Sequence, residues 1–281
     1  MIVKVAFLLF LQIQLLHVNA YSNEPLYVAK TRLDRLNYIA LYSKQWQQDS
    51  ADIHSIREEP MILLIGSVYS KFLSFNSHFT FDSILMGHSR EERLRLIGSR
   101  ITPQAFVFYK IFKNHNVHNM EIFDRVAADL YRYSQPLHVF QWQILPDTMQ
   151  VSGYAAQKAT TSFAGRDWVA WFTPEIPISD GPYKFNGLPG LIVLLYDTRN
   201  HYRFALTSFA ENQSERFIHK TVSDQTHAFN TTRERMIAMR WRFIKEPFTL
   251  MPNVSPMGGA AQREEVLQRL RRRNNPLELR Y

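Results

Sequence analysis

The chain has 281 residues, of which 46% are hydrophobic and 14% aromatic, a composition typical of a packed globular protein. It holds 33 Lys and Arg against 25 Asp and Glu, and this formal charge of +8 favours anionic partners. The sequence contains no cysteine, which excludes disulfides, a lipid-modified cysteine anchor and a thiol nucleophile.

The first twenty residues have the pattern of a cleavable secretory signal peptide. Lys4 precedes the apolar run Val5–Leu11, and the segment ends in small residues at Val18–Ala20. A transmembrane anchor would need about 20 uninterrupted apolar residues, whereas polar side chains interrupt this run from Gln12 onward. We therefore predict a signal peptide over 1–20 and an exported protein of the periplasm or cell envelope, or a secreted one, without a transmembrane span after cleavage.

Export narrows the partners that a basic surface can meet. Lipopolysaccharide, acidic glycans and acidic protein faces are open to such a protein, so an anionic envelope surface is one predicted partner. Nucleic acid is excluded, because it lies in another compartment. The alternative is a basic, solvated surface without any specific anion site.

Strand patterns dominate the body of the chain. β-Branched and aromatic residues predict strands over 61–65, 68–75, 106–112, 130–133 and 139–142. A first hairpin is predicted from Thr160–Phe163 and Asp167–Phe172, because Gly165 between them suits a tight turn. A second hairpin is predicted from Leu191–Tyr196 and His201–Phe209. Together these segments indicate a meander of about nine or more strands.

Helical patterns are fewer. Residues 89–97 begin with a capping serine. Residues 262–273 place apolar side chains at helical spacing, with acids early and arginines late, as the helix dipole favours. We predict a mainly β (α+β) fold with a strongly curved antiparallel sheet or half-barrel, a few helices and a C-terminal helix. The predicted parts are an antiparallel β-rich domain over 21–250, a Pro/Gly linker over 251–261, and a C-terminal helix and tail over 262–281.

A family motif follows the first hairpin. Residues 187–192 read Gly-Leu-Pro-Gly-Leu-Ile after a distinctive run from Trp168 to Asn186, and Gly153–Thr160 and Asn275–Leu279 extend the likeness. On these residues the chain resembles the GLPGLI family, secreted or envelope proteins of Bacteroidota whose activity is unknown. The resemblance implies proximity to envelope uptake systems and a structural role for the motif residues Gly187, Leu188, Pro189, Gly190, Leu191 and Ile192. Ala156 stands where many members have cysteine, which favours packing at that position.

The loop from Pro174 to Gly190 is the main candidate site. Four prolines and three glycines make it stiff and specifically shaped. As a binding lip, the loop and the strand before it would supply the predicted ligand-binding residues Trp168, Phe172, Glu175, Asp180, Tyr183, Lys184 and Asn186. The alternative, with equal weight, is that the loop covers a sheet edge and protects unpaired backbone.

Two further patterns have residue types that could carry chemistry. Glu175 and Asp180 could act as general acid and base in a hydrolase, near His201. Acidic residues in such loops are more often turn formers, so we predict no catalytic residue. His115 and His118 have a zinc-ligand spacing, but the surrounding asparagines favour a surface loop, and we predict no metal and no cofactor.

The leading functional hypothesis is a non-enzymatic envelope or secreted protein that binds a hydrophobic ligand or peptide, or that assists an outer-membrane receptor. One alternative is a secreted hydrolase with acid and base carboxylates in the loop over 174–190. Another is a structural module that docks on an envelope protein through its C-terminal helix, and this alternative requires an exposed apolar stripe on that helix.

Overall fold

The computed structural model describes residues 30–78, 105–250 and 260–280. In this part of the chain a sheet of twelve strands runs in the order β14-β7-β6-β5-β4-β3-β2-β12-β11-β10-β9-β8. All neighbouring strands are antiparallel except the pair β14 and β7. The strands are β2 (Tyr38–Gln47), β3 (Ile56–Ile65), β4 (Tyr69–Ser74), β5 (Lys110–Asn114), β6 (Asn119–Val126), β7 (Asp129–Pro136), β8 (Gln143–Val151), β9 (Tyr154–Phe163), β10 (Arg166–Thr173), β11 (Leu191–Asp197), β12 (Tyr202–Glu211) and β14 (Phe229–Asn230).

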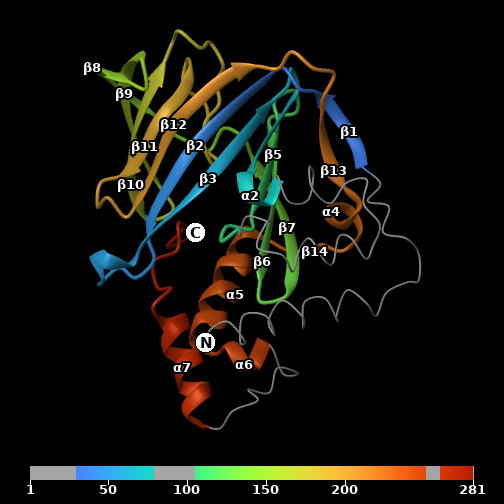
Figure 1. The fold of residues 1–281 in the computed structure, drawn as a ribbon, viewed down its shortest axis with the longest axis vertical. Coiled ribbons are helices and arrows are strands. Elements are labelled where there is room, and N and C mark those ends of the chain that lie inside the picture. The colour runs from blue at the N-terminus through green and yellow to red at the C-terminus, as the bar shows by residue number, and fades with distance from the viewer. Residues whose placement is uncertain (1–29, 79–104, 251–259, 281) are drawn as a thin grey trace.

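The large sheet is strongly curved and remains open (Figure 1). Its two edge strands, β8 and β14, do not pair with each other, so the sheet is not a closed barrel. A separate ribbon of β1 (Lys30–Arg35) and β13 (Phe217–Thr221) flanks it. The helical elements described are η1 (Ile53–Ser55), α2 (Phe75–His78), α4 (Val222–Thr226), α5 (Arg233–Lys245), α6 (Pro247–Leu250) and α7 (Ala260–Arg271). The predicted mainly β fold with a few helices is therefore confirmed.

The core fills the concave side of the sheet because side chains alternate between its faces. On β2, Ala40 and Tyr42 point inward and are buried. Phe72 and Phe204 join them from β4 and β12 and stack edge to face at a centroid distance of 6.3 Å. Aromatic rings provide much of this core, which therefore combines large buried area with directional ring contacts.

A smaller apolar cluster covers the opposite face. Ile62, Leu64 and Leu73 of the large sheet pack there with Leu36 and with Ile218 of the ribbon. This second cluster explains why β3 is apolar on both faces near its end, where a strand exposed on one face would alternate with polar residues.

Most predicted strands are present, with shifted ends. Both predicted hairpins are confirmed, as β9 with β10 and as β11 with β12. The strand predicted over 139–142 is wrong: these residues run irregularly between β7 and β8, where Phe140 and Trp142 pack against Phe185 as loop residues. The predicted signal peptide over 1–20, the helix over 89–97 and most of the linker over 251–261 lie outside the described residues.

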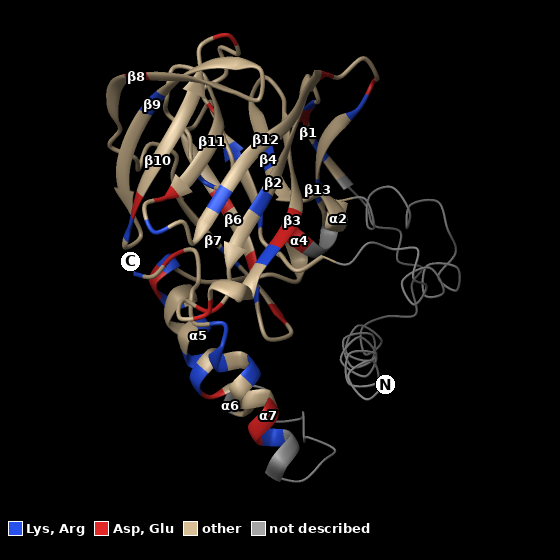
Figure 2. Cartoon of the chain, turned by 60° about the vertical axis from the view of Figure 1, so that its left-hand side comes forward, with Lys and Arg blue, Asp and Glu red and all other residues tan. Residues whose placement is uncertain are grey.

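Helices α5, α6 and α7 lie together at one end of the sheet (Figure 1), whereas α2 lies beside β3 and β4, and α4 beside β13. Helix α5, which no pattern had indicated, begins at a cap where the Thr232 side chain accepts from the backbone N–H of Arg235. The C-terminal helix is present as α7 and packs against α5. Acidic and basic side chains both lie along these helices (Figure 2). In the described part of the chain, no helix has the length and apolar character to cross a bilayer.

Candidate functional site

The loop between β10 and β11 folds back into the protein instead of standing out from it. Its backbone makes two consecutive three-residue turns of the γ type. Ile178 N–H donates to Ile176 O at 2.7 Å, and Asp180 N–H donates to Ile178 O at 2.8 Å. The first residues of β11 tie it down, since Leu191 and Ile192 donate to the carbonyls of Ile176 and Asp180 at 3.0 Å each. These hydrogen bonds hold the loop against the start of β11.

The family motif closes this loop by packing. Leu188, Leu191 and Ile192 are buried, whereas Pro189 is exposed at the turn. A Cβ on Gly190 would lie 2.1 Å from the carbonyl oxygen of Thr173, so only glycine fits there. The motif therefore closes the loop through three buried apolar side chains and one close backbone approach.

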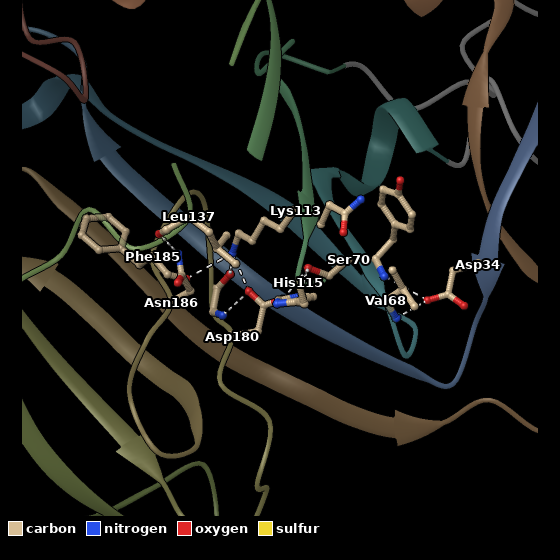
Figure 3. A network of polar contacts seen from close by, with 12 residues as sticks. Asp34, Val68, Ser70, Lys113, His115, Leu137, Asp180, Phe185 and Asn186 are labelled. Carbon is tan, nitrogen blue, oxygen red and sulfur yellow. Dashed lines mark hydrogen bonds and ion pairs between the residues drawn. The ribbon is translucent and has the colours of Figure 1, made fainter. Parts of the chain in front are cut away.

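Asp180 is the centre of a buried polar network that joins the loop to β4 and β5 (Figure 3). Its Oδ1 accepts a hydrogen bond from Lys113 Nζ at 2.5 Å. Its Oδ2 accepts a short hydrogen bond from the Ser70 hydroxyl and lies 3.6 Å from Nε2 of His115. Because a carboxylate can only accept, Ser70 gives its proton to Asp180, and it is not arranged as a nucleophile activated by His115.

Lys113 is fully buried and has three acceptors for its three protons. Besides Asp180, it donates to the carbonyl oxygens of Gly181 at 2.9 Å and Phe185 at 3.1 Å. Burial lowers the pKa of Lys113, and the charge of Asp180 partly offsets this. Burial likewise opposes ionisation of Asp180, but Lys113 and His115 outweigh it and hold the pKa of that carboxyl well below its usual range. Asp180 is therefore ionised at neutral pH.

A second buried network fixes the next residues of the loop to the C-terminal tail. Lys184 Nζ forms a short ion pair with Glu278 and donates to the Tyr133 hydroxyl at 2.8 Å. The hydroxyl of Tyr183 donates to Glu278 at 2.6 Å, and Arg233 at the start of α5 pairs with the same carboxylate at 2.8 Å. Burial lowers the pKa of Lys184 to about 8, with Glu278 offsetting part of the shift.

Arg166, at the tight end of the first hairpin, holds the rest of the tail. It pairs with Asp197 at 2.9 Å and donates to Asn275 Oδ1 at 2.6 Å, Pro276 O at 2.8 Å and Leu277 O at 3.0 Å. The segment Asn275–Leu279 is thus a packed tail without strand pairing, and it is integrated into the body of the protein.

The predicted ligand-binding residues are mostly interior. Trp168, Phe172, Asp180, Tyr183, Lys184 and Asn186 are all buried, with fractional exposures of 5% or less. Glu175 alone is exposed, and it accepts from the backbone N–H of Ala155 at 2.7 Å. Glu175 and Asp180 therefore have separate environments and partners, and the acid and base pair of a hydrolase is not formed. His201 lies beside Arg166, 3.4 Å from Nδ1 to the guanidinium.

His115 and His118, the two histidines with a zinc-ligand spacing, contact different residues. His115 belongs to the Asp180 network, whereas His118 contacts His138 with its Nδ1 3.0 Å from that residue's Nε2. Within the described residues, no group of three or more His, Asp or Glu side chains has the arrangement of a metal site.

Two open depressions lie on either side of Val139, which lines both. The larger, of about 520 Å³, is lined by hydroxyl and amide side chains that include Gln141, Gln143 and Thr198. The smaller, of about 410 Å³, is lined by residues that include Phe163 and Arg233. Of the residues that the sequence predicted for ligand binding, Trp168 alone lines either depression, because the lining is drawn from β7, β8, β9, β10, α5 and the loops between them.

The larger depression borders an unpaired stretch of strand. The pairing of β8 with β9 ends where Gln143 faces Thr160, so Thr161 and Ser162 have no strand partner on that side among the described residues. Thr161 also lines the depression, is 8% exposed, and its hydroxyl has no hydrogen-bond partner in the described part of the chain. Among the described residues, the free side of β9 and the unpartnered Thr161 hydroxyl therefore both border the larger depression.

The apolar side of the C-terminal helix is not free. Leu270 is buried, and Val266 and Leu267 are half-buried, while the exposed positions carry Arg and Glu such as the pair Arg269 and Glu265 at 2.8 Å. The exposed apolar stripe that docking through this helix requires is therefore not present on α7.

One family model matches a short segment of the chain. The family model described as "Protein of unknown function (Porph_ging)" matches residues 163–194, which include β10, the loop and most of β11. No curated protein matches the chain.

Two solved structures are among those that match the chain at low sequence identity. "Structure of PNGF-II in P21 space group" is 13% identical, with a TM-score of 0.49, over 74% of this chain and 33% of that one. "Structure of PNGF-II in C2 space group" is 14% identical, with a TM-score of 0.47, over the same shares. The chain thus spans about a third of the length of these structures.

Proposed function

We propose that the protein is an exported, non-enzymatic member of the GLPGLI family that binds an extended peptide at the depressions flanking Val139. The family assignment is supported by the match over residues 163–194, because that segment contains the hexapeptide Gly187–Ile192. Export, to the periplasm, the cell envelope or the medium, is supported by the signal-like pattern of residues 1–20.

The observation that carries peptide binding is the free side of β9 beside the larger depression. An extended peptide can continue the line of β8 there and pair with the backbone of Ser162, whose N–H and C=O point away from β10. Main-chain pairing of this kind supplies affinity, and pockets for alternate side chains supply selectivity. The two depressions lie where such side chains would point, one lined by Gln143 and Thr198 and the other by Phe163 and Arg233.

The same geometry favours a peptide over a hydrophobic small molecule. The concave side of the sheet is occupied by buried aromatic side chains such as Phe72, Phe185 and Phe204. A carrier of apolar cargo would need an enclosed apolar cavity. The lining of the larger depression is instead rich in hydroxyl and amide groups, which suit the polar backbone of a peptide. A peptide segment of an outer-membrane receptor is one such partner.

Peptide selection with a blocked variant tests this proposal. The mature chain, residues 21–281, is used to select binders from a random peptide library, and the best peptide is titrated calorimetrically. Thr198→Trp should fill the larger depression and weaken binding at least about tenfold, or about 1.4 kcal/mol. Arg199→Trp, at the neighbouring exposed position outside the depression, is the control and should bind as the wild type does. Failure to select any peptide, or equal binding by Thr198→Trp, would refute the proposal.

A further inference from the structure

Lys44 of β2 is an inward-pointing lysine surrounded by aromatic rings. It follows Ala40 and Tyr42 on the buried face of the strand and is 4% exposed. Its Nζ lies 4.4 Å from the ring of Trp46 and 5.2 Å from the ring of Tyr109. Two further rings, those of Tyr202 and Phe204, have centroids 5.7 Å and 6.0 Å from the same Nζ.

This amine differs from Lys113 and Lys184, the two buried lysines of the polar networks described above. Lys113 and Lys184 each contact a carboxylate, whereas Lys44 has no ion-pair or hydrogen-bond partner among the described residues. Glu59 faces Lys44 directly across β2 and β3. Its carboxylate, however, is held by a short hydrogen bond from Ser74 and by the backbone N–H of Phe106 at 2.9 Å. The lysine amine is therefore left without a counter-ion in contact.

Burial without a contacting carboxylate changes the charge state of Lys44. Burial lowers its pKa to about 7, although Glu59 and Asp124 nearby offset part of the shift. About half of the molecules then carry a neutral amine at pH 7, and a neutral amine in an apolar surround is a nucleophile. Arg240, which pairs with Asp124 at 2.5 Å, further disfavours the ammonium form of Lys44.

Tyr109, one of the aromatic residues around Lys44, carries a second polar group without a hydrogen-bond partner among the described residues. It is 8% exposed, and its hydroxyl has no hydrogen-bond partner in the part of the chain that the structure describes. Burial raises the pKa of Tyr109 well above its usual value, so the hydroxyl keeps its proton and can donate it. A nucleophilic amine therefore lies 5.2 Å from the ring of a tyrosine whose hydroxyl is an unused proton donor, and these are the two groups that addition to a carbonyl group needs.

We propose that Lys44 and Tyr109 form a carbonyl-capture site that takes small, uncharged aldehydes. The lone pair of the amine attacks the carbonyl carbon and forms a C–N bond, while the π electrons of the C=O bond move to its oxygen. That oxygen takes the proton of the Tyr109 hydroxyl, the positively charged nitrogen returns one proton to the tyrosinate, and the neutral carbinolamine then loses water to give an imine. Uncharged aldehydes are favoured because the walls are aromatic and the carboxylates of Glu59 and Asp124 lie near. This site is separate from the peptide-binding depressions.

Reductive trapping tests the site. The full mature protein is treated at pH 7 with acetaldehyde and cyanoborohydride, which reduces each imine to a stable ethylated lysine, and peptide mass spectrometry follows every lysine in time. Lys44 should be ethylated at least about tenfold faster than the exposed Lys245. Tyr109→Phe should slow ethylation of Lys44 several-fold without changing Lys245. Lys44→Met should lose the fast label while the other lysines react as before.

The pH dependence separates a special amine from simple exposure. Between pH 7 and 9 the ethylation rate of Lys44 should rise only about twofold, because its amine is already half neutral at pH 7. The rate of Nα-acetyl-lysine added as an internal standard should rise about a hundredfold over the same range. Labelling of Lys44 slower than that of Lys245, or with the pH dependence of the standard, would overturn the proposal. An unchanged rate in Tyr109→Phe would overturn the role of that hydroxyl.

Discussion

Replacing Asp180 by asparagine should destabilise the protein more than almost any other single polar change. The carboxylate and its partner Lys113 are both fully buried and joined at 2.5 Å, and the lysine retains only the carbonyls of Gly181 and Phe185 when the charge is removed. Leaving one member of a buried pair uncompensated typically costs about 3–5 kcal/mol. We expect Asp180→Asn to lower the unfolding free energy by about that amount at pH 7.

The loss should depend on pH in a defined direction. Without Asp180, the folded-state pKa of Lys113 falls further below its unfolded value, so the unfolded state binds more protons and stability rises as pH increases. The difference between Asp180→Asn and wild type should therefore shrink between pH 7 and pH 10, because Lys113 can then be buried as a neutral amine. Wild type should show a smaller rise from this pair, since the charge of Asp180 offsets part of the effect of burial on the pKa of Lys113.

Guanidinium unfolding followed by tryptophan fluorescence measures these differences, with Lys113→Met and the double variant completing a cycle. The double variant should lose clearly less than the sum of the single losses, because neither charge is then left alone. Asp147→Asn is the matched control: its pair with Lys158 is exposed and 3.5 Å long, and it should change stability by less than about 1 kcal/mol. A loss below about 1 kcal/mol in Asp180→Asn, or strictly additive losses, would refute the reasoning.

Three further outcomes are expected. Gly190→Ala should lower the unfolding free energy by about 1–3 kcal/mol or prevent folding, because its Cβ would meet Thr173 O at 2.1 Å; a wild-type melting temperature would contradict this. Lys44→Met should weaken the rise of stability between pH 7 and 10, since each unit by which burial depresses the folded pKa is worth about 1.4 kcal/mol, and an unchanged pH profile would be the contrary result. Glu278→Gln should destabilise by about 3–5 kcal/mol because Lys184 and Arg233 lose their shared carboxylate, and a change within 0.5 kcal/mol, as for a typical surface site, would contradict the buried placement.

Local patterns in the sequence were enough for the elements whose partners lie nearby in the chain. Gly165 with alternating residues on both sides predicted the hairpin of β9 and β10, and the hairpin is held by neighbours only a few residues apart. Leu191–Tyr196 predicted a strand buried on both faces, as β11 is. Helix α5 escaped prediction because its buried residues Met236, Ile237 and Ile244 form too narrow a stripe among charged residues.

The polar sites could not be read in the same way, because their partners are distant in sequence. Asp180 looked like an acid of an exposed loop, yet it meets Lys113, 67 residues earlier, inside the curved sheet. Lys184 meets Glu278, 94 residues later, only because the tail returns to the sheet end. Nothing in residue spacing encodes such encounters, since they follow from which strands are neighbours and which way the sheet bends.

The sequence by itself determined the β-rich class, the two hairpins and the C-terminal helix, since these follow from side-chain period and turn chemistry. It also determined the stiffness of the loop over 174–190, which follows from the φ preferences of proline and glycine. Only the tertiary structure decided that the loop lies inside the protein, that Lys44 has aromatic walls and no carboxylate in contact, and that β9 keeps a free side next to a depression. The physical reason is that burial and charge pairing depend on the whole packed sheet, whereas strand and turn formation depend on a few adjacent residues.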